Sequence, residues 1–319
     1  MHFELSCPDI SDWKQGNTGV EGVWNFDSGK AGRHVMISCL VHGNELCGAW
    51  AVKGVLESGL RPENGKLTLV FANLRAFERF DPTNHDASRF VDEDMNRLWM
   101  PERMAQATTK ERQRVVQLEP FVKQADWLLD LHSMHEVAQP LLLTGIHPRN
   151  QLLAREIGNP VHVVVDAGHK DGTRMRDFGH FGAPDEQAPY TRSLLIECGF
   201  HGDPQSKVVA QDMVARFLAA SGCLSDGRVE HFLLEWRLPS SNEQWALDVA
   251  GAVVAKSVNF RFMEEFKGLE VIAKAGTVIG DNDGEPVVTP YDECVLVMPS
   301  VRQARAGVTV VRFAKRRLL

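Results

Sequence analysis

The sequence predicts an α/β fold with a mixed, mainly parallel sheet that carries helices on both faces, followed by a small all-β domain. Over the first two thirds of the chain, short apolar runs of strand length alternate with helical patterns, which is typical of α/β domains. Beyond the polar stretch 221–228 the helical periodicity mostly disappears, and short β-type runs separated by turn residues replace it. We therefore expect a first domain over residues 1–225 and a β domain over residues 226–319.

The expected strands of the first domain are runs of apolar residues bounded by polar ones. They span residues 34–41, 66–72, 127–131, 141–143, 161–165 and 192–198. Helical patterns span residues 45–58, 103–125 and 206–220. In the C-terminal region, β-type runs span residues 245–255, 269–272, 277–279, 287–288 and 294–298. The stretch from Asn73 to Met100 remains as a long loop, and long ordered loops in compact domains are usually functional.

The composition excludes several classes of protein. The 319 residues are 44% hydrophobic and 24% charged, as in ordinary soluble globular proteins. The formal net charge is −7 with both signs mixed along the chain, so we expect no broad surface that neutralises nucleic-acid phosphates. The basic run Lys315-Arg316-Arg317 is interpreted as a solvated tail. Six scattered cysteines without a CxxC pair indicate reduced thiols.

The sequence also predicts the location of the protein. Its first residues show no basic region followed by an apolar stretch, which excludes a signal peptide. No apolar run approaches the ~20 residues that span a bilayer. We therefore expect a cytoplasmic protein with no membrane partner and no nucleic-acid partner. The sequence leaves open whether the chain forms a homo-oligomer.

The segment His42-Gly43-Asn44-Glu45 joins the first buried strand to the helix that follows it. In an open α/β sheet, ligands bind outside the carboxyl ends of the strands. A histidine and a carboxylate on such a turn can converge on one metal ion, and imidazole nitrogen with carboxylate oxygen suits zinc. The alternative is a surface histidine beside a glutamate that the helix dipole favours.

A second histidine occupies the end of another apolar strand, in Asp130-Leu131-His132-Ser133. His132 is the natural third metal ligand, and Asp130 could orient a ligand or fix the local backbone. His135 and Glu136 follow closely and compete for the ligand role. We rank them lower because they lie past the end of the strand.

Glu197 lies within the apolar strand 192–198. A carboxylate in a buried strand is costly unless it is paired or functional. Beside a metal-bound water, Glu197 could act as a general base and then deliver the proton to a leaving amine. The alternative is a glutamate at the strand end that is paired with an arginine.

The long loop carries arginines in Asn73-Leu74-Arg75-Ala76 and Asp94-Met95-Asn96-Arg97. A guanidinium matches carboxylates in bidentate fashion, and near zinc it can stabilise the oxyanion of a tetrahedral intermediate. For Arg79, Arg89 and Arg103 we expect surface salt bridges instead.

Taken together, these segments resemble the aspartoacylase and succinylglutamate desuccinylase family, a branch of the zinc carboxypeptidase superfamily. The matching segments are His42-Gly43-Asn44-Glu45, Asn73-Leu74-Arg75-Ala76, Asp94-Met95-Asn96-Arg97, Asp130-Leu131-His132-Ser133 and Ile196-Glu197-Cys198-Gly199. Their order and separations fit from residue 34 to about residue 200, and the small C-terminal β domain also looks like the family's.

The resemblance implies a zinc-dependent catalytic domain over residues 1–225, with the C-terminal β domain covering its cleft and excluding large peptides. His42, Glu45 and His132 would bind one zinc ion, and Glu197 would activate the water. The reaction would be hydrolysis of the amide bond of a small acidic N-acyl amino acid.

The resemblance also implies how the substrate is held. Arg75 would polarise the scissile carbonyl, while Asn96 and Arg97 would bind a substrate carboxylate. The family also uses an arginine ahead of the catalytic glutamate and a late tyrosine. Here Arg192 lies nearer to Glu197 than the family spacing, Arg174 and Arg176 lie farther away, and Arg302 or Arg305 occupies the late position.

Two other functions stay open at this point. A zinc carboxypeptidase acting on peptides or on an amidated small molecule would use the same catalytic groups, and an open cleft would favour it. A non-catalytic metal-binding scaffold is the third hypothesis, and an intact Glu197 argues against it.

Overall fold

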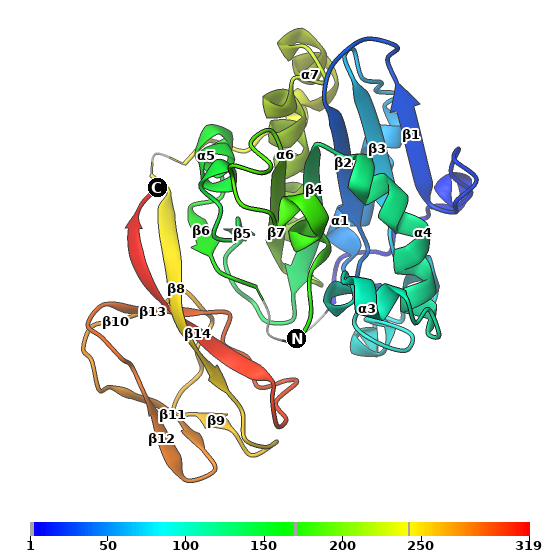
Figure 1. The fold of residues 1–319 in the computed structure, drawn as a ribbon. Helices are drawn as coiled ribbons and strands as arrows, with labels where there is room; N and C mark the ends of the chain where they lie inside the picture. Colours follow the sequence, from blue (N-terminus) through cyan, green and yellow to red (C-terminus); the bar gives the residue numbers. More distant parts are fainter. Residues whose placement is uncertain (1–2, 169–170, 242) are drawn as a thin grey trace.

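The computed structural model describes residues 3–168, 171–241 and 243–319. Its main sheet has eleven strands in the order β1-β3-β2-β4-β7-β5-β6-β8-β14-β13-β10, and a second sheet has the order β12-β11-β9. Figure 1 shows helices on both sides of the main sheet and a β-rich lobe formed by the C-terminal part of the chain. The predicted α/β class with additional antiparallel strands at the C-terminus is confirmed.

Seven strands build the first part of the main sheet. They are β1 Val23–Asp27, β2 His34–Cys39, β3 Lys66–Phe71, β4 Trp127–Met134, β5 Leu141–Leu143, β6 His162–Val165 and β7 Arg192–Phe200. Strands β3, β2, β4 and β7 run parallel to one another. Strand β1 pairs antiparallel with β3 at one edge, and β5 pairs antiparallel with β7. The sheet is therefore mixed with a parallel centre.

Within the described ranges of the chain, seven α-helices and several short 3-10 turns connect the strands. The helices are α1 Leu46–Glu57, α2 Leu74–Phe77, α3 Pro101–Met104, α4 Lys110–Gln124, α5 Pro148–Ile157, α6 Pro204–Ser221 and α7 Asp226–Leu233. The 3-10 turns are η1 Ser11–Trp13, η2 His85–Ser88, η3 Met95–Arg97, η4 Met175–Asp177, η5 Gly179–Phe181 and η6 Leu234–Trp236. Among the described residues, none of these helices is long and apolar enough to cross a membrane.

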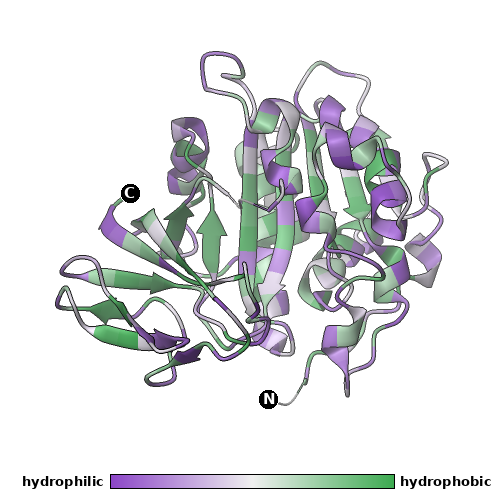
Figure 2. Cartoon of the chain, turned by 60° about the horizontal axis from the view of Figure 1, so that its bottom comes forward, coloured by the Kyte–Doolittle hydropathy of each residue, from purple (hydrophilic) through white to green (hydrophobic). Residues whose placement is uncertain are grey.

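The core lies on both faces of the central strands because successive strand residues point to opposite sides. Val35 and Ile37 of β2 pack in one cluster with α1, α5 and α6. Met36, between them, packs in a second cluster with Val115 and Leu118 of α4. Figure 2 shows mostly green, hydrophobic strands in the middle of the sheet and purple, hydrophilic stretches on the helices. Burial on both faces explains why these strands are continuous apolar runs.

The C-terminal strands continue the main sheet. They are β8 Trp245–Val254, β9 Arg261–Phe262, β10 Val271–Ile272, β11 Val278–Asn282, β12 Glu285–Val288, β13 Cys294–Val297 and β14 Thr309–Leu318. Strand β8 pairs parallel with β6 and antiparallel with β14. Hydrogen bonding thus runs without a break past residue 225, and a domain boundary at that position stays a prediction.

The structure differs from the sequence-based expectation at several elements. The helix expected over 103–125 is interrupted, and α4 begins after Thr109, whose Oγ accepts a hydrogen bond from the Arg112 N–H at 3.3 Å. Strand β1, helix α5 and strand β14 were not predicted. The basic run 315–317 is exposed to solvent as expected, but it is not a tail, because it belongs to β14, where Arg317 Nε lies 2.8 Å from Asp248 Oδ2.

Helix α1 approaches the sheet closely at Gly48. A Cβ added there would lie 2.7 Å from the Cβ of Cys39 and 2.8 Å from that of Leu131. We expect Gly48→Ala to lower the free energy of unfolding by about 1–3 kcal/mol because the helix must move off the strands. Gly227→Ala in α7 is the control, since its Cβ would meet nothing within 4 Å, and alanine is the better helix former. Urea unfolding measures both, and equal midpoints would contradict this packing.

Candidate metal centre and active site

Three neighbouring parallel strands carry the candidate catalytic groups to one edge of the sheet. His42 follows β2 after a sharp turn in which Leu40 has φ +57°, and Glu45 directly precedes α1. His132 lies within β4, which runs three residues beyond its predicted end. Glu197 of β7 is the register partner of His132. The strand order thus places residues from distant parts of the sequence side by side.

The Glu45 carboxylate lies between two imidazoles. Its Oε1 is 2.7 Å from His42 Nδ1, and its Oε2 is 2.8 Å from His132 Nδ1. One potential ligand atom from each residue lies within 4.8 Å of the others, and all three residues are buried. Two nitrogens and one carboxylate oxygen are the donor set of many catalytic zinc sites, which keep a fourth position open. The residues present therefore fit a zinc ion.

Two aspartates orient the histidines from behind. Asp94 Oδ1 lies 2.9 Å from His42 Nε2, and Asp130 Oδ2 lies 3.0 Å from His132 Nε2. A carboxylate at Nε2 holds the proton there and leaves the Nδ1 lone pair for a metal. This arrangement agrees with the orienting role that we considered for Asp130.

The charges of this cluster strongly shift its pKa values. Burial alone would raise the pKa of Glu45, but His42 and His132 hold it well below its usual range. Burial alone would lower the pKa of His132, but Asp130 and Glu45 raise it well above its usual range. The cluster therefore keeps an ionised carboxylate in a buried position, where it attracts a cation.

Glu197 lies beside this cluster and lines the same pocket. Its Oε2 is buried and makes no hydrogen bond within the described parts of the chain. Burial, followed by the charge of Glu45, raises the pKa of Glu197 well above its usual range. No arginine ion pair is recorded for it among the described residues, so the geometry favours a proton-transfer group over the paired strand-end glutamate.

The structure changes the assignment of the loop arginines. Asn96 and Arg97 line the pocket as expected. Arg75 does not, because α2 directs it to solvent, where it lines a separate depression with Lys110 and Arg114. The expected contact of Arg75 with a substrate carbonyl therefore disagrees with the structure.

Arg89, expected to be a surface residue, lies in the pocket instead. Its Nη2 is 3.2 Å from Asp94 Oδ2, and its Nη1 is 3.5 Å from Glu45 Oε1. Its Nε is buried without a hydrogen-bond partner among the described residues. The only sequence signal for Arg89 is its place in the same long loop as Asn96 and Arg97.

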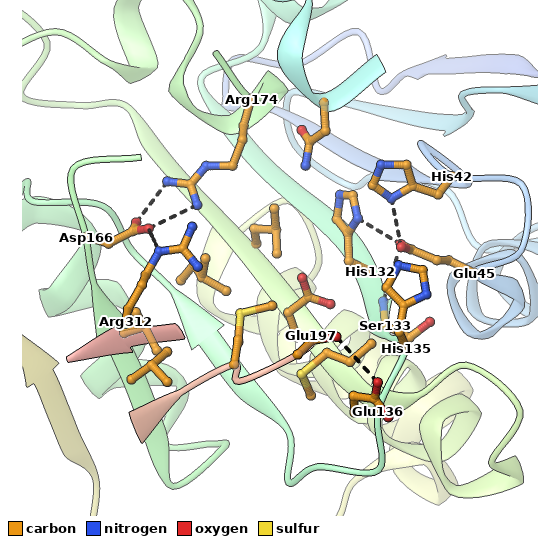
Figure 3. Close-up of a pocket in the computed structure, with 18 of the residues that line it drawn as sticks. His42, Glu45, His132, Ser133, His135, Glu136, Asp166, Arg174, Glu197 and Arg312 are labelled. Carbon is orange, nitrogen blue, oxygen red and sulfur yellow. Dashed lines mark hydrogen bonds and ion pairs between the residues drawn. The ribbon is translucent and has the colours of Figure 1, made fainter. Parts of the chain in front are cut away.

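Figure 3 shows the pocket with the His42-Glu45-His132 cluster at one end and a second charged group, which contains Asp166, Arg174 and Arg312, at the other. The cavity measures about 150 Å³. Its apolar wall includes residues of the first part of the chain and of the C-terminal strands, namely Met134, Leu143, Val164, Leu195, Val297, Met298 and Pro299. The C-terminal part of the chain therefore helps to close the site.

The second charged group was not foreseen as a unit. Arg174 Nη2 lies 2.8 Å from Asp166 Oδ1, and Arg174 Nε lies 2.6 Å from Asp177 Oδ2. Arg312 of β14 reaches the same aspartate, with Nε 4.0 Å from Oδ2. Burial alone would raise the pKa of Asp166, but Arg174 contributes most to lowering it to about 2. Two parts of the chain that are far apart in sequence, one with Asp166, Arg174 and Asp177 and the other with Arg312, thus form a buried ion-pair network at the end of the pocket away from the His42-Glu45-His132 cluster.

The comparison with known proteins agrees with this geometry. Residues 31–185 match the family model of the succinylglutamate desuccinylase/aspartoacylase catalytic domain. This part of the chain is similar to the catalytic domain of the succinylglutamate desuccinylase/aspartoacylase family. The similarity supports a hydrolase of the desuccinylase/aspartoacylase type. No curated protein sequence matches the chain.

Solved structures share its fold at low sequence identity. Succinylglutamate desuccinylase from Vibrio cholerae is 18% identical with a TM-score of 0.66, over 93% of this chain and 86% of that one. The ectoine utilization protein EutE (DoeB) from Ruegeria pomeroyi is 16% identical with a TM-score of 0.59, over 89% and 86%. Murine aminoacylase 3 is 17% identical with a TM-score of 0.55, over 91% and 97%. The shared fold includes the C-terminal strands, because these matches cover most of the chain.

The buried Asp166–Arg174 pair predicts a pH-dependent contribution to stability. We expect Asp166→Asn to lower the free energy of unfolding by about 1–3 kcal/mol at neutral pH, because Nη2 of the buried Arg174 guanidinium loses its carboxylate partner while Nε stays paired with Asp177. Since the folded pKa of Asp166 is lowered to about 2, this contribution is complete above the unfolded pKa of ~4 and is lost as the pH falls through about 2.

Chemical denaturation at a series of pH values measures this contribution. The difference between wild type and Asp166→Asn should narrow as the pH falls from ~4 toward ~2. Asp248→Asn, which breaks the exposed pair with Arg317, is the matched control and should cost less than about 1 kcal/mol. Equal losses in the two variants would contradict the buried network.

Proposed function

We propose that the protein is a zinc-dependent amidohydrolase that cleaves the amide bond of a small acidic N-acyl amino acid. The observation that carries this proposal is the buried His42-Glu45-His132 cluster beside the unpartnered carboxylate oxygen of Glu197. A base next to a metal position with a free coordination site is the arrangement used for metal-assisted hydrolysis.

Each group has a defined task in this reaction. His42, Glu45 and His132 would hold zinc, which supplies a Lewis acid that polarises a carbonyl and lowers the pKa of water. Glu197 accepts a proton from the attacking water and passes it to the leaving amine nitrogen. Arg89 donates its unpartnered Nε–H to the oxygen of the scissile carbonyl as negative charge develops there.

The remainder of the pocket holds the rest of the substrate. Asn96 and Arg97 would bind a substrate carboxylate, and the fact that both line the cavity supports this role and an acidic substrate. At the far end, Arg174 and Arg312 line the cavity together with Asp166, with which both are paired. The residues from Val297 to Ser300 form a wall, and this wall favours a small substrate over the peptides of a carboxypeptidase.

The proposal is tested with a panel of N-acetyl and N-succinyl amino acids offered to zinc-loaded protein. We expect release of free amino acid from at least one acidic member, loss of activity with a chelator, and recovery with zinc.

Glu197→Gln should keep its metal content but lose about 10²–10⁴-fold in kcat. Glu119→Gln, on the outer helix α4, is the control. A panel without any cleaved member would refute the proposal, and cleavage of peptides alone would favour the carboxypeptidase.

The proposal that Arg89, and not Arg75, binds the oxygen of the scissile carbonyl has its own test. Arg89→Ala should lower kcat by about 10²–10³-fold because a donor to the developing oxyanion is lost. Arg75→Ala should leave kcat within about twofold, because surface substitutions away from the site have little effect. Steady-state kinetics on the same substrate compares kcat of the two variants. A larger loss of kcat in Arg75→Ala than in Arg89→Ala would assign the contact with the carbonyl to Arg75.

A further inference from the structure

His135 lies at the centre of a polar network that the proposed mechanism does not use. It follows β4 by one residue and is mostly buried, with 18% of its side chain exposed. Its ring contacts four side chains from three separate segments, namely Asp86 and Arg89, His201, and Gln303. In Figure 3 it lies directly beside Glu45 and His132 without joining their cluster. His135 is therefore placed to act on the site from outside the metal position.

One tautomer of His135 satisfies these contacts. Arg89 Nη1 and Gln303 Nε2 each lie 3.2 Å from Nε2 of His135. Both are N–H donors, so Nε2 must accept and cannot carry a proton. The proton then belongs on Nδ1, which lies 3.3 Å from Asp86 Oδ1. A carboxylate at Nδ1 fixes this tautomer and aims the lone pair of Nε2 at Arg89.

His201 supports the ring of His135 from the other side. Its Nε2 lies 3.3 Å from His135 Nδ1, and its Nδ1 lies 2.7 Å from Ser133 Oγ. His201 is fully buried. Its ring centre is 4.7 Å from that of His135 in an edge-on arrangement. The imidazole of His135 thus has little freedom to rotate.

Besides His135, the side-chain partners that the structure describes for Arg89 are two carboxylates. Asp94 and Glu45 contact Arg89 through Nη2 and Nη1. The contact to His135 also uses Nη1, so these three partners leave Nε unengaged. Without His135, the guanidinium could turn to pair fully with the Asp94 and Glu45 carboxylates. Such a turn would withdraw Nε from the substrate carbonyl.

The C-terminal part of the chain holds the network in place. Besides Gln303, Arg302 contributes its guanidinium, with Nε 2.9 Å from Glu136 Oε1 and Nη1 3.4 Å from Asp86 Oδ2. Arg302 thus ties together the residue that follows His135 and the aspartate that fixes its tautomer. This link joins the 300–303 segment to the loop that carries Arg89.

We propose that His135 is a positioning residue that aims Arg89 at the scissile carbonyl, and that Gln303 and Arg302 hold it for this purpose. The inference rests on the proposed hydrolase function, because it takes Arg89 as the group that binds the carbonyl oxygen. It assigns the C-terminal segment a part in the chemical step in addition to closing the pocket.

A double-mutant cycle in kcat tests the coupling. His135→Ala should lower kcat by about 10–100-fold with little change in KM, because a small misplacement of a catalytic group is costly. His135→Gln should restore most of kcat, since an amide oxygen can accept from Arg89. In an Arg89→Ala background, His135→Ala should have almost no further effect. Equal losses in both backgrounds would overturn the proposal, as would a loss expressed in KM alone.

Gln303→Leu tests the same connection from the exposed side of the network, where a folding defect is not expected. It should lower kcat in the same direction as His135→Ala but by less, and Arg302→Met should do likewise. Arg305→Met, two residues beyond Gln303, is the matched control, because the structure describes contacts to His135, Glu136 or Asp86 for Arg302 and Gln303 but not for Arg305. Unchanged kcat in Gln303→Leu and Arg302→Met would remove the C-terminal segment from the proposal.

A readout that needs no substrate separates this proposal from the proposed function. Crystal structures and metal analysis of zinc-loaded wild type and His135→Ala should show equal zinc content and a displaced Arg89 guanidinium in the variant. If the wild type cleaves no N-acyl compound, the hydrolase proposal fails. The positioning role of His135 is still decided by whether the Arg89 guanidinium moves in His135→Ala. An unmoved Arg89 would overturn that role whatever the activity.

Discussion

The buried carboxylate of Glu45 is the group around which the rest of the site is arranged. Both of its oxygens are engaged by imidazole nitrogens, and Oε2 also accepts from the Ser133 backbone N–H at 3.3 Å. A buried charge is tolerated only with such compensation. This compensation requires that the chain turn after β2 to present His42, that α1 begin after Glu45, and that β4 extend far enough to present His132. The fold places these three points together because the two strands are parallel neighbours.

The pKa of a second buried carboxylate nearby, that of Glu197, is shifted in the opposite direction to the pKa of Glu45. The pKa of Glu45 is lowered by two histidines, whereas burial and the charge of Glu45 raise the pKa of Glu197. Two carboxylates whose environments push their pKa values apart can divide the tasks of holding charge and moving protons. The pKa of the same chemical group is thus shifted in opposite directions at the two positions, and the difference comes from its neighbours.

The parts of this structure that the sequence predicts are those governed by local pattern. Strands buried on both faces are continuous apolar runs, and the histidines next to β2 and in β4 therefore stand out. The segments missed depend on distant partners. Strand β14 carries many charged residues and is a strand because it pairs with β8 along most of its length. Thr109 divides one expected helix because its side chain caps α4.

The same reasoning explains the errors within the site. No periodicity indicates where a loop side chain points, so the sequence favours Arg75 for the site and a surface salt bridge for Arg89, whereas the path of the loop brings Arg89 into the pocket. No local pattern indicates that Arg312 joins Asp166 and Arg174, because this contact forms only when β14 joins the sheet. Family resemblance located the segments correctly but not every side chain within them.

The unbroken hydrogen bonding from β6 to β8 has a consequence for engineering the chain. Strand β6 is covered along its outer edge by β8. Removing the C-terminal strands would expose a short, apolar edge with free backbone donors and acceptors, and such edges recruit strands from other molecules. A shortened chain would therefore be exposed to intermolecular aggregation as well as to loss of the pocket wall, which makes the lobe a poor candidate for exchange as an independent module.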